Sequence, residues 1–228
     1  MVYKSIRWSE RLQIFIMKCL ILIFLSCTLI SAQPQPCMSP GQYVGSMSLT
    51  AADGIITSAA TYSYDSHDQK IRFRNYLTIL DKTVYMDLLM HFKEGVMYEI
   101  DYSSFSCKKK VLESSFHPMQ VPPDAVFMGQ VVLGTTSVPG LGLLTNSWVG
   151  EISEIQAQYM LTFTEFTCLP VSAMVYMPHT GWITISFYNH QLGEQNPEDF
   201  TPPFFCQTAA LEKHEDLPKT NFLKAIRQ

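Results

Sequence analysis

The cysteines are the residues of this chain that could form covalent cross-links. Two of the six, Cys19 and Cys27, lie in an apolar N-terminal run. The other four are widely spaced and contain no CxxC pair: Cys37, Cys107, Cys168 and Cys206. Structural zinc sites usually draw cysteines from short spacings, so metal binding by these four is disfavoured. Their even number predicts two disulfides, with three pairings open, and therefore an oxidising extracellular environment.

Other patterns that could support catalysis or metal binding are weak. The chain lacks GxSxG and HExxH motifs. The run Gly140-Leu141-Gly142-Leu143-Leu144 resembles the start of a dinucleotide loop, but it follows Pro139 and lacks the third glycine. His67 lies between Asp65 and Asp68, and two carboxylates supply too few of the roughly six to eight oxygens that calcium prefers. We therefore predict a protein that is not an enzyme and has no certain cofactor, with the metal site unknown.

A predicted β-hairpin from Val84 to Cys107 is the clearest structural element, because its residues alternate between apolar and polar on both sides of Lys93-Glu94-Gly95. One face would carry a continuous apolar row: Met86, Leu88, Met90, Phe92, Val96, Tyr98 and Ile100. Such a face must pack on a second layer or enclose an apolar ligand. Methionine adapts to ligands of varied shape but also fills ordinary cores, so the residues alone leave both interpretations open.

The remaining segments predict about ten strands joined by short turns and almost no helix, typical of an all-β sandwich or partly closed barrel. Residues 70–80 read as one such strand, with Ile71, Phe73 and Asn75 on one face. The helix-forming residues around Ala209 and Leu211 predict one short C-terminal helix over 206–215. No linker or internal repeat is visible, which indicates a single domain.

The N-terminal residues 1–32 are predicted to be a signal peptide, because basic residues precede a short apolar run that ends near Ser31-Ala32. The run is too short for a membrane span, and translation could start at Met1 or Met17. We expect the domain over 33–215 and a loosely held tail over 216–228. Removing the four basic residues and one acidic residue of 1–32 leaves a net charge of −7, which argues against nucleic acid and anionic membranes as partners.

Several motifs in the predicted domain resemble the ependymins and ependymin-related proteins. Their order and spacing match the family: Pro36-Cys37, Tyr64-Asp65 with Gln69-Lys70, Phe92-Lys93-Glu94-Gly95-Val96-Met97, Cys168-Leu169-Pro170-Val171, Gln191-Leu192-Gly193, Asp199-Phe200-Thr201-Pro202-Pro203 and Cys206-Gln207. The resemblance extends roughly over 37–212. It implies two stacked antiparallel sheets around a hydrophobic pocket, similar to bacterial periplasmic lipoprotein carriers. It also implies homodimers, and disulfides that pair Cys37 with Cys168 and Cys107 with Cys206.

The resemblance leads to two functional hypotheses for a secreted protein. The first is a non-catalytic carrier of a hydrophobic small molecule or lipid, with the hairpin face as its pocket. The alternative is a calcium-tuned adhesion protein that contacts the extracellular matrix and whose β core is only a scaffold. This chain departs from the family in lacking a cysteine near Lys82 and any N-x-Ser/Thr sequon. N-glycans therefore cannot mediate calcium binding or lysosomal sorting of this chain. We expect at most weak calcium binding, with a dissociation constant of roughly 10⁻⁴–10⁻³ M.

Overall fold

The computed structural model describes residues 13, 15–22, 33–51, 54–178, 180–193 and 196–212, except for the side chain of residue 154. These fall into two units, Met1–Gln35 and Pro36–Gln228. In the first unit, residues 15–22 are helical, and none of the described helices is long and apolar enough to cross a membrane. Most of the predicted signal peptide, 1–32, and all of the predicted tail, 216–228, lie outside the described residues.

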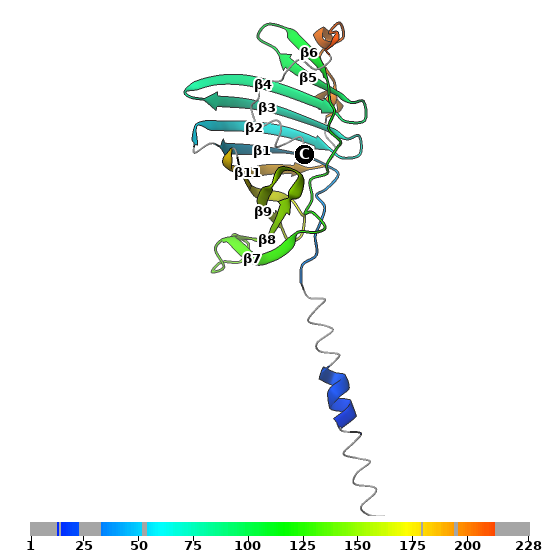
Figure 1. Cartoon of the computed structure of the whole chain (residues 1–228), viewed down its shortest axis with the longest axis vertical. Helices are drawn as coiled ribbons and strands as arrows, with labels where there is room; N and C mark the ends of the chain where they lie inside the picture. Colours follow the sequence, from blue (N-terminus) through cyan, green and yellow to red (C-terminus); the bar gives the residue numbers. More distant parts are fainter. Residues whose placement is uncertain are drawn as a thin grey trace, which may run out of the picture. The chain divides into compact units, whose positions relative to one another are not determined.

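The second unit is built on one sheet whose strands lie in the order β12-β6-β5-β4-β3-β2-β1-β11-β10-β9-β8-β7 (Figure 1). All neighbouring pairs are antiparallel except β12 and β6. The strands are β1 (Gln42–Ala51), β2 (Ile56–Asp65), β3 (Lys70–Ile79), β4 (Lys82–His91), β5 (Val96–Asp101), β6 (Ser106–Val111), β7 (Val126–Gly134), β8 (Gly142–Ile152), β9 (Ala157–Thr164), β10 (Pro170–Met177), β11 (Gly181–Leu192) and β12 (Leu211–Glu212).

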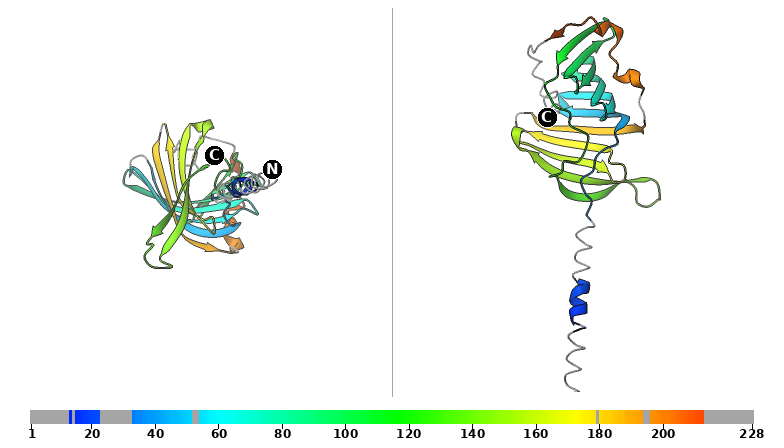
Figure 2. Two further views of the ribbon diagram at one scale, coloured as in Figure 1. Left: turned by 90° about the horizontal axis from the view of Figure 1, so that it is seen from below. Right: turned by 90° about the vertical axis from the view of Figure 1, so that its right-hand side faces the viewer.

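The expectation of two separate stacked sheets is wrong, because β1 joins the two halves of the molecule. On one side β1 pairs with β2 along its whole length, and on the other side it pairs with β11. The resulting twelve-stranded sheet is strongly coiled, so the strands at its two ends run in different directions (Figure 2). The sheet is not closed into a barrel, and β7 and β12 form its edges.

Residues 197–212, here named the C-terminal segment, contain short 3-10 helices, and the described part of the predicted helix over 206–215 is not helical beyond Cys206. Helices η3 (Pro197–Phe200) and η4 (Phe204–Cys206) are followed by β12, whose Leu211 and Glu212 pair with Lys109 and Lys110 of β6. A third 3-10 helix, η2 (Ser153–Ile155), lies between β8 and β9. Helix propensity is a weak local preference, and here the pairing of β12 with the edge of the sheet overrides it.

The β4–β5 hairpin forms as predicted, but its turn is one residue longer than expected. Phe92 is the first residue of a four-residue turn that ends at Gly95, where φ is 64°. Because the turn starts at Phe92, the last residue of β4, His91, pairs with the first residue of β5, Val96. A three-residue loop would have paired Phe92 with Val96 and placed them on one face. Because side chains alternate along a strand, the change of one residue moves every β5 side chain to the opposite face.

The C-terminal segment covers the outer face of β3–β6. His91 Nε2 lies 2.9 Å from the carbonyl oxygen of Phe200, and Arg72 Nη1 donates a 3.0 Å hydrogen bond to the carbonyl oxygen of Asp199. A buried apolar cluster forms between the two layers: Leu89, Tyr98, Ile100, Phe200 and Cys206. This packing orients η3 and η4 on the sheet, but it involves few residues of these short helices.

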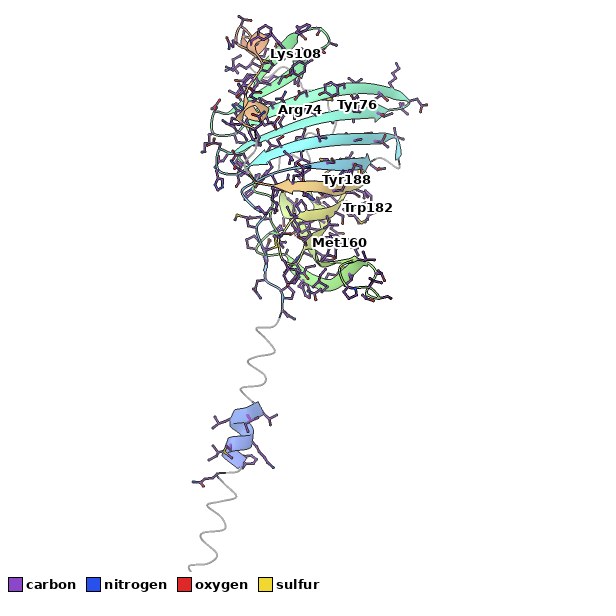
Figure 3. All side chains as sticks on the ribbon, turned by 180° about the vertical axis from the view of Figure 1, so that it is seen from behind. Arg74, Tyr76, Lys108, Met160, Trp182 and Tyr188 are labelled. Carbon is purple, nitrogen blue, oxygen red and sulfur yellow. A yellow bond between two sulfur atoms is a disulfide. The ribbon has the colours of Figure 1, made fainter. Side chains whose placement is uncertain are left out.

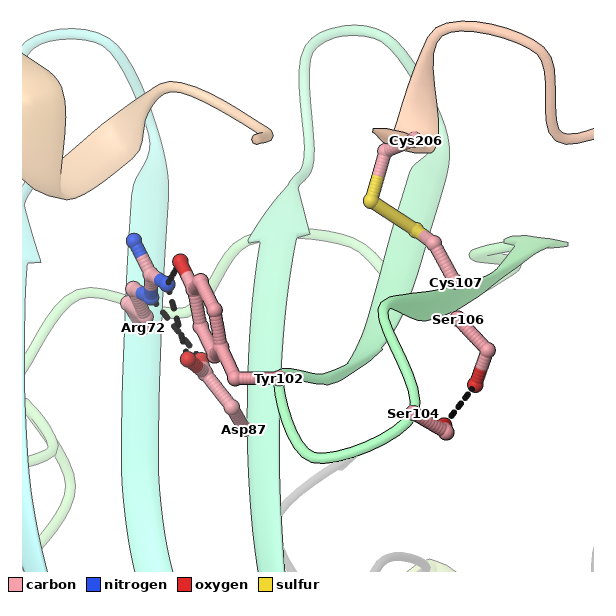
Figure 4. The surroundings of a disulfide bond; sticks show 7 residues. All are labelled: Arg72, Asp87, Tyr102, Ser104, Ser106, Cys107 and Cys206. Atoms are coloured by element: carbon pink, nitrogen blue, oxygen red, sulfur yellow. Dashed lines mark hydrogen bonds and ion pairs between the residues drawn. A yellow bond between two sulfur atoms is a disulfide. The ribbon is translucent and has the colours of Figure 1, made fainter. Parts of the chain in front are cut away.

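The structure contains both disulfides that the family resemblance implies. Cys37 bonds Cys168 with a Cα–Cα distance of 5.9 Å, and Cys107 bonds Cys206 at 5.2 Å. The first links the N-terminus of the domain to the residue pair preceding β10. The second links β6 to η4 and thereby holds the C-terminal segment on the outer face (Figure 4).

Candidate functional site: a covered apolar pocket

An apolar hollow, here named the apolar pocket, lies on the inner face of β1–β5. Its lining alternates along each strand, because successive side chains point to opposite faces of a sheet. Ala60 lies between Met47 and Asn75 in the strand register, and Phe73 pairs with Leu88. The strand residues that line the pocket are Met47, Ser58, Ala60, Ile71, Phe73, Asn75, Leu88, Met90 and Met97.

Residues 112–121, here named the covering segment, lie over this pocket. Four of their side chains line it: Ser114, Ser115, His117 and Met119. At one end Leu112 N–H donates to the carbonyl of Gly95 at 2.8 Å, and at the other Val121 N–H donates to the carbonyl of Cys37 at 2.8 Å. Because Cys37 is bonded to Cys168, the second anchor of the covering segment is tied covalently to the sheet.

Tyr64 is the main contact between the sheet and the covering segment. Its ring stacks on Phe116 with centroids 6.0 Å apart, and its hydroxyl oxygen accepts a 3.1 Å hydrogen bond from Met119 N–H. The hydroxyl of Tyr43 contacts the sulfur of Met119 at 2.8 Å. Burial raises the pKa of both phenols, so this wall stays uncharged at neutral pH.

The chemistry of the lining suits an apolar ligand. Met47, Met90, Met97 and Met119 contribute flexible, polarisable side chains, and the described lining contains no Asp, Glu, Lys or Arg. The volume of this partly open pocket is about 160 Å³, close to the roughly 150 Å³ of a dry cavity that admits benzene. Ser115 Oγ and His117 Nε2 lie 3.2 Å apart, but both side chains are exposed, so the pair is solvated rather than held for nucleophilic attack.

The seven predicted pocket residues separate into two groups. Leu88, Met90 and Phe92 line the pocket, and Met86 lies on the same sheet face opposite Asn75 but outside the lining. The prediction that Val96, Tyr98 and Ile100 share this face is wrong. Tyr98 and Ile100 are buried in the outer cluster beneath the C-terminal segment, with the partly buried Val96 packed against it, because of the longer turn.

Sequence reasoning missed most of the other lining residues. The alternation in β3 correctly placed Ile71, Phe73 and Asn75 on one face of the strand. It did not indicate whether that face contacts the covering segment or the C-terminal segment. Met97 was not among the predicted pocket residues, because of the same turn error. The covering segment has no regular secondary structure over most of its length and therefore no periodicity that a sequence could reveal.

A second, polar hollow of about 520 Å³ lies beside the β1–β11 pairing, where the register shifts between Val44 and Ser46. Arg74 lines this polar hollow. Its side chain lies on the face of β3 opposite to the apolar pocket, as does that of Tyr76 (Figure 3). Arg74 Nη2 lies 2.8 Å from the carboxylate of Asp199, which also lines the hollow. The charges in this hollow therefore neutralise each other and do not define an anion site.

The described residues do not form a calcium site. Among them, no group of three or more His, Cys, Asp or Glu side chains is close enough together to bind a metal ion. Asp65 is buried and acts as a turn cap, since its Oδ1 accepts hydrogen bonds from the N–H groups of His67 and Asp68 at 2.8 and 3.0 Å. Asp68 instead lies 3.4 Å from the ammonium group of Lys93. These carboxylates stabilise the β2–β3 turn.

The burial of His190 predicts that the stability of the folded domain depends on pH. Its ring lies 5.7 Å from Tyr43, and its Nε2 is buried without a hydrogen-bond partner among the described residues. Burial lowers the pKa of His190 below the value near 6.5 of the unfolded chain. The unfolded state thus binds more protons as pH falls below about 6.5, and the folded state loses stability there. We expect His190→Phe to reduce the loss of urea resistance between pH 7 and pH 5.

The control for this prediction is His67→Gln, which changes an exposed histidine on the β2–β3 turn. We expect it to leave the pH dependence unchanged. A His190→Phe protein with the same pH dependence as the unaltered protein would show that another group causes the acid sensitivity.

Fold and site together define the class of this molecule: a disulfide-linked β protein with one coiled sheet and a covered apolar pocket. The sequence model of the Ependymin family matches residues 80–206. Ependymin-2 from Carassius auratus is 35% identical over 186 residues, 82% of this chain and 86% of that protein. Ependymin from Notemigonus crysoleucas is 36% identical with the same coverage. The chain belongs to the ependymin family.

Two further comparisons describe the range of similarity. Mammalian ependymin-related protein 1 from Mus musculus is 30% identical over 80% of this chain and 81% of its own length. Among solved structures, an uncharacterized conserved protein from Thermus thermophilus superposes with a TM-score of 0.49 at 9% identity, over 79% of this chain and 91% of the other. The similarity to bacterial lipoprotein carriers stays a prediction.

Proposed function

We propose that this protein is a secreted, non-catalytic binding protein that holds a hydrophobic small molecule or a lipid chain in the apolar pocket. The observation that carries the proposal is a pocket whose described lining contains four methionines and no acid or strong base, on a sheet that a separate segment covers. Ligand pockets are typically concave and mostly apolar, with a few placed polar groups. The two disulfides and the similarity to ependymins support an extracellular location.

The covering segment would control access to the pocket. Its ends are fixed by backbone hydrogen bonds, but its central part rests on the sheet mainly through the contacts of Phe116 with Tyr64 and Phe92. A ligand much larger than the pocket volume of about 160 Å³ would extend through the pocket opening or move this central part outward. Apolar contacts are non-directional, so such a displacement costs less than breaking the anchored ends.

Filling the pocket tests the proposal. Ala60 lines the pocket, whereas its neighbour Ala59 is exposed on the opposite face of β2. We expect Ala60→Phe to weaken binding of the hydrocarbon fluorophore diphenylhexatriene by about tenfold or more, equivalent to about 1.4 kcal/mol. Ala59→Phe adds the same group one residue away and should leave the affinity unchanged. Equal affinities of the two variants, or no binding by the unaltered protein, would refute the proposal.

Calcium binding, homodimer formation and contact with the extracellular matrix stay predictions from the family resemblance. The adhesion alternative would use the outer face of the sheet, where Tyr76, Trp182 and Tyr188 are exposed (Figure 3). Exposed aromatic side chains are common at protein interfaces. The pocket-filling variants separate the hypotheses, because Ala60→Phe should not affect adhesion through the outer face.

A further inference from the structure

The apolar pocket contains polar atoms that the described residues leave without a hydrogen-bond partner. Asn75 is only 4% exposed, and its side-chain oxygen has no hydrogen-bond partner among the described residues. Its amide nitrogen makes one long contact, 3.4 Å to the hydroxyl of Ser58. The hydroxyl of Ser114 in the covering segment is also buried without a partner among those residues. All three residues line the pocket.

An unpaired polar atom in an apolar pocket destabilises the free protein, since it has lost its hydrogen bonds to water without replacement. Buried polar groups in folded proteins are nearly always paired, so each exception requires an explanation. Asn75 faces the opposing Met86 on β4 and Ala60 on β2, where a leucine would pack without this penalty. The cost is compensated if a bound molecule supplies the missing partner.

We propose that the ligand is an aliphatic molecule with an uncharged hydroxyl end, which donates a hydrogen bond to Asn75 Oδ1 inside the pocket. This inference rests on the apolar-ligand function proposed above and names the chemical class of the ligand. A hydroxyl group both donates and accepts, so it can serve either atom of the Asn75 amide and the hydroxyl of Ser114. An alkane would leave Asn75 Oδ1 and the hydroxyl of Ser114 without partners among the described residues.

Charged ends fit the same pocket poorly. An ionised carboxylate accepts hydrogen bonds but cannot donate one to Asn75 Oδ1. An ammonium group can donate, but the described lining contains no Asp or Glu to neutralise it. Burying either charge without a counter-charge is strongly unfavourable. His117, the titratable residue of the described lining, is exposed and shares its Nε2 contact with Ser115.

The first test measures the cost of the unpaired amide in the free protein. We expect Asn75→Leu to raise the urea midpoint of unfolding, because it replaces an unsatisfied polar group by an apolar one of similar size. Asn146→Leu is the matched control. Asn146 is similarly buried, but its side chain accepts a 3.1 Å hydrogen bond from Gln130 and donates one to Glu165, so its replacement should lower the midpoint. A lower midpoint for Asn75→Leu would overturn the inference.

The second test uses ligands of one chain length at pH 8. Decanol, decanoate and decylammonium each compete with diphenylhexatriene for the unaltered protein and for Asn75→Leu. We expect decanol to compete best, and Asn75→Leu to weaken decanol by roughly 3- to 10-fold more than it changes the affinity for diphenylhexatriene, the effect of one hydrogen bond.

The outcomes distinguish this inference from the proposed function. Absence of diphenylhexatriene binding, or its insensitivity to Ala60→Phe, refutes the binding function itself. Retained diphenylhexatriene binding with decanoate or decylammonium as the best competitor refutes only the hydroxyl inference. Equal weakening of all three competitors by Asn75→Leu also refutes it, because the effect would then be one of packing.

Discussion

Replacing Cys107 and Cys206 together by serine is expected to lower the free energy of unfolding by about 4 kcal/mol and to release the C-terminal segment. The cysteines are 99 residues apart, and in the chain-entropy model closing a loop of about 100 residues stabilises by about 4.7 kcal/mol, with measured values often lower. Phe200 and Cys206 would separate from Leu89, Tyr98 and Ile100, because η3 and η4 are too short to stay in place alone.

The effect on the pocket distinguishes the two disulfides. Cys107 and Cys206 act on the outer face, so the double serine variant should bind diphenylhexatriene with unchanged affinity. The Cys37→Ser, Cys168→Ser variant should lose comparable stability and also bind the probe more weakly, because Cys37 anchors the covering segment through Val121. Urea unfolding gives the stabilities, and hydrogen exchange of residues 197–212 reports release of the segment. Equal effects of both variants on probe binding would contradict this assignment.

Replacing Asp87 by leucine is expected to destabilise the domain by about 3–5 kcal/mol, because it leaves the guanidinium of Arg72 buried without its counter-charge. The two side chains are 3% and 0% exposed, and Arg72 Nε and Nη2 donate hydrogen bonds of 2.8 and 2.7 Å to the two carboxylate oxygens (Figure 4). Burial disfavours the charged guanidinium, but the hydrogen bonds and charge of Asp87 outweigh this and raise the pKa of Arg72.

A double-mutant cycle tests the cause of this loss. Arg72→Met combined with Asp87→Leu removes both charges, and we expect it to recover at least half of the lost stability, since apolar replacements of buried ion pairs are often neutral. The hydrogen bonds of Arg72 to Tyr102 and to the carbonyl of Asp199 are lost in the double variant, so recovery should be incomplete.

A more exposed ion pair provides the control for this cycle. Lys110 and Glu99 lie 2.6 Å apart with side chains 19% and 26% exposed. Surface pairs contribute roughly 0–1 kcal/mol, so this partly exposed pair should contribute less than the buried one, and Lys110→Ala should cost less than Asp87→Leu. A double variant of Arg72 and Asp87 that is no more stable than Asp87→Leu alone would show that the loss comes from packing rather than from the unpaired charge.

Local patterns in the sequence determined the class of fold. Alternation of apolar and polar residues has the period of a strand, and it identified β3, β4 and β5 because it depends only on neighbouring residues. The four separated cysteines indicated disulfides, and the family motifs implied their pairing. The face that carries Leu88 and Met90 was also recognisable from the sequence, as was Asn75 on the same face as Ile71 and Phe73.

The tertiary structure alone decided how these strands combine. Alternation does not specify partners, so nothing in β1 showed that it pairs with β2 and β11 and makes one sheet instead of two. The turn at Phe92 differs from the prediction by one residue, and this reverses β5 because the side-chain period is two. The covering segment is irregular, and only its distant contacts with Gly95, Tyr64 and Cys37 place it over the pocket. The candidate site is thus set by contacts between residues far apart in the chain, which local periodicity cannot encode.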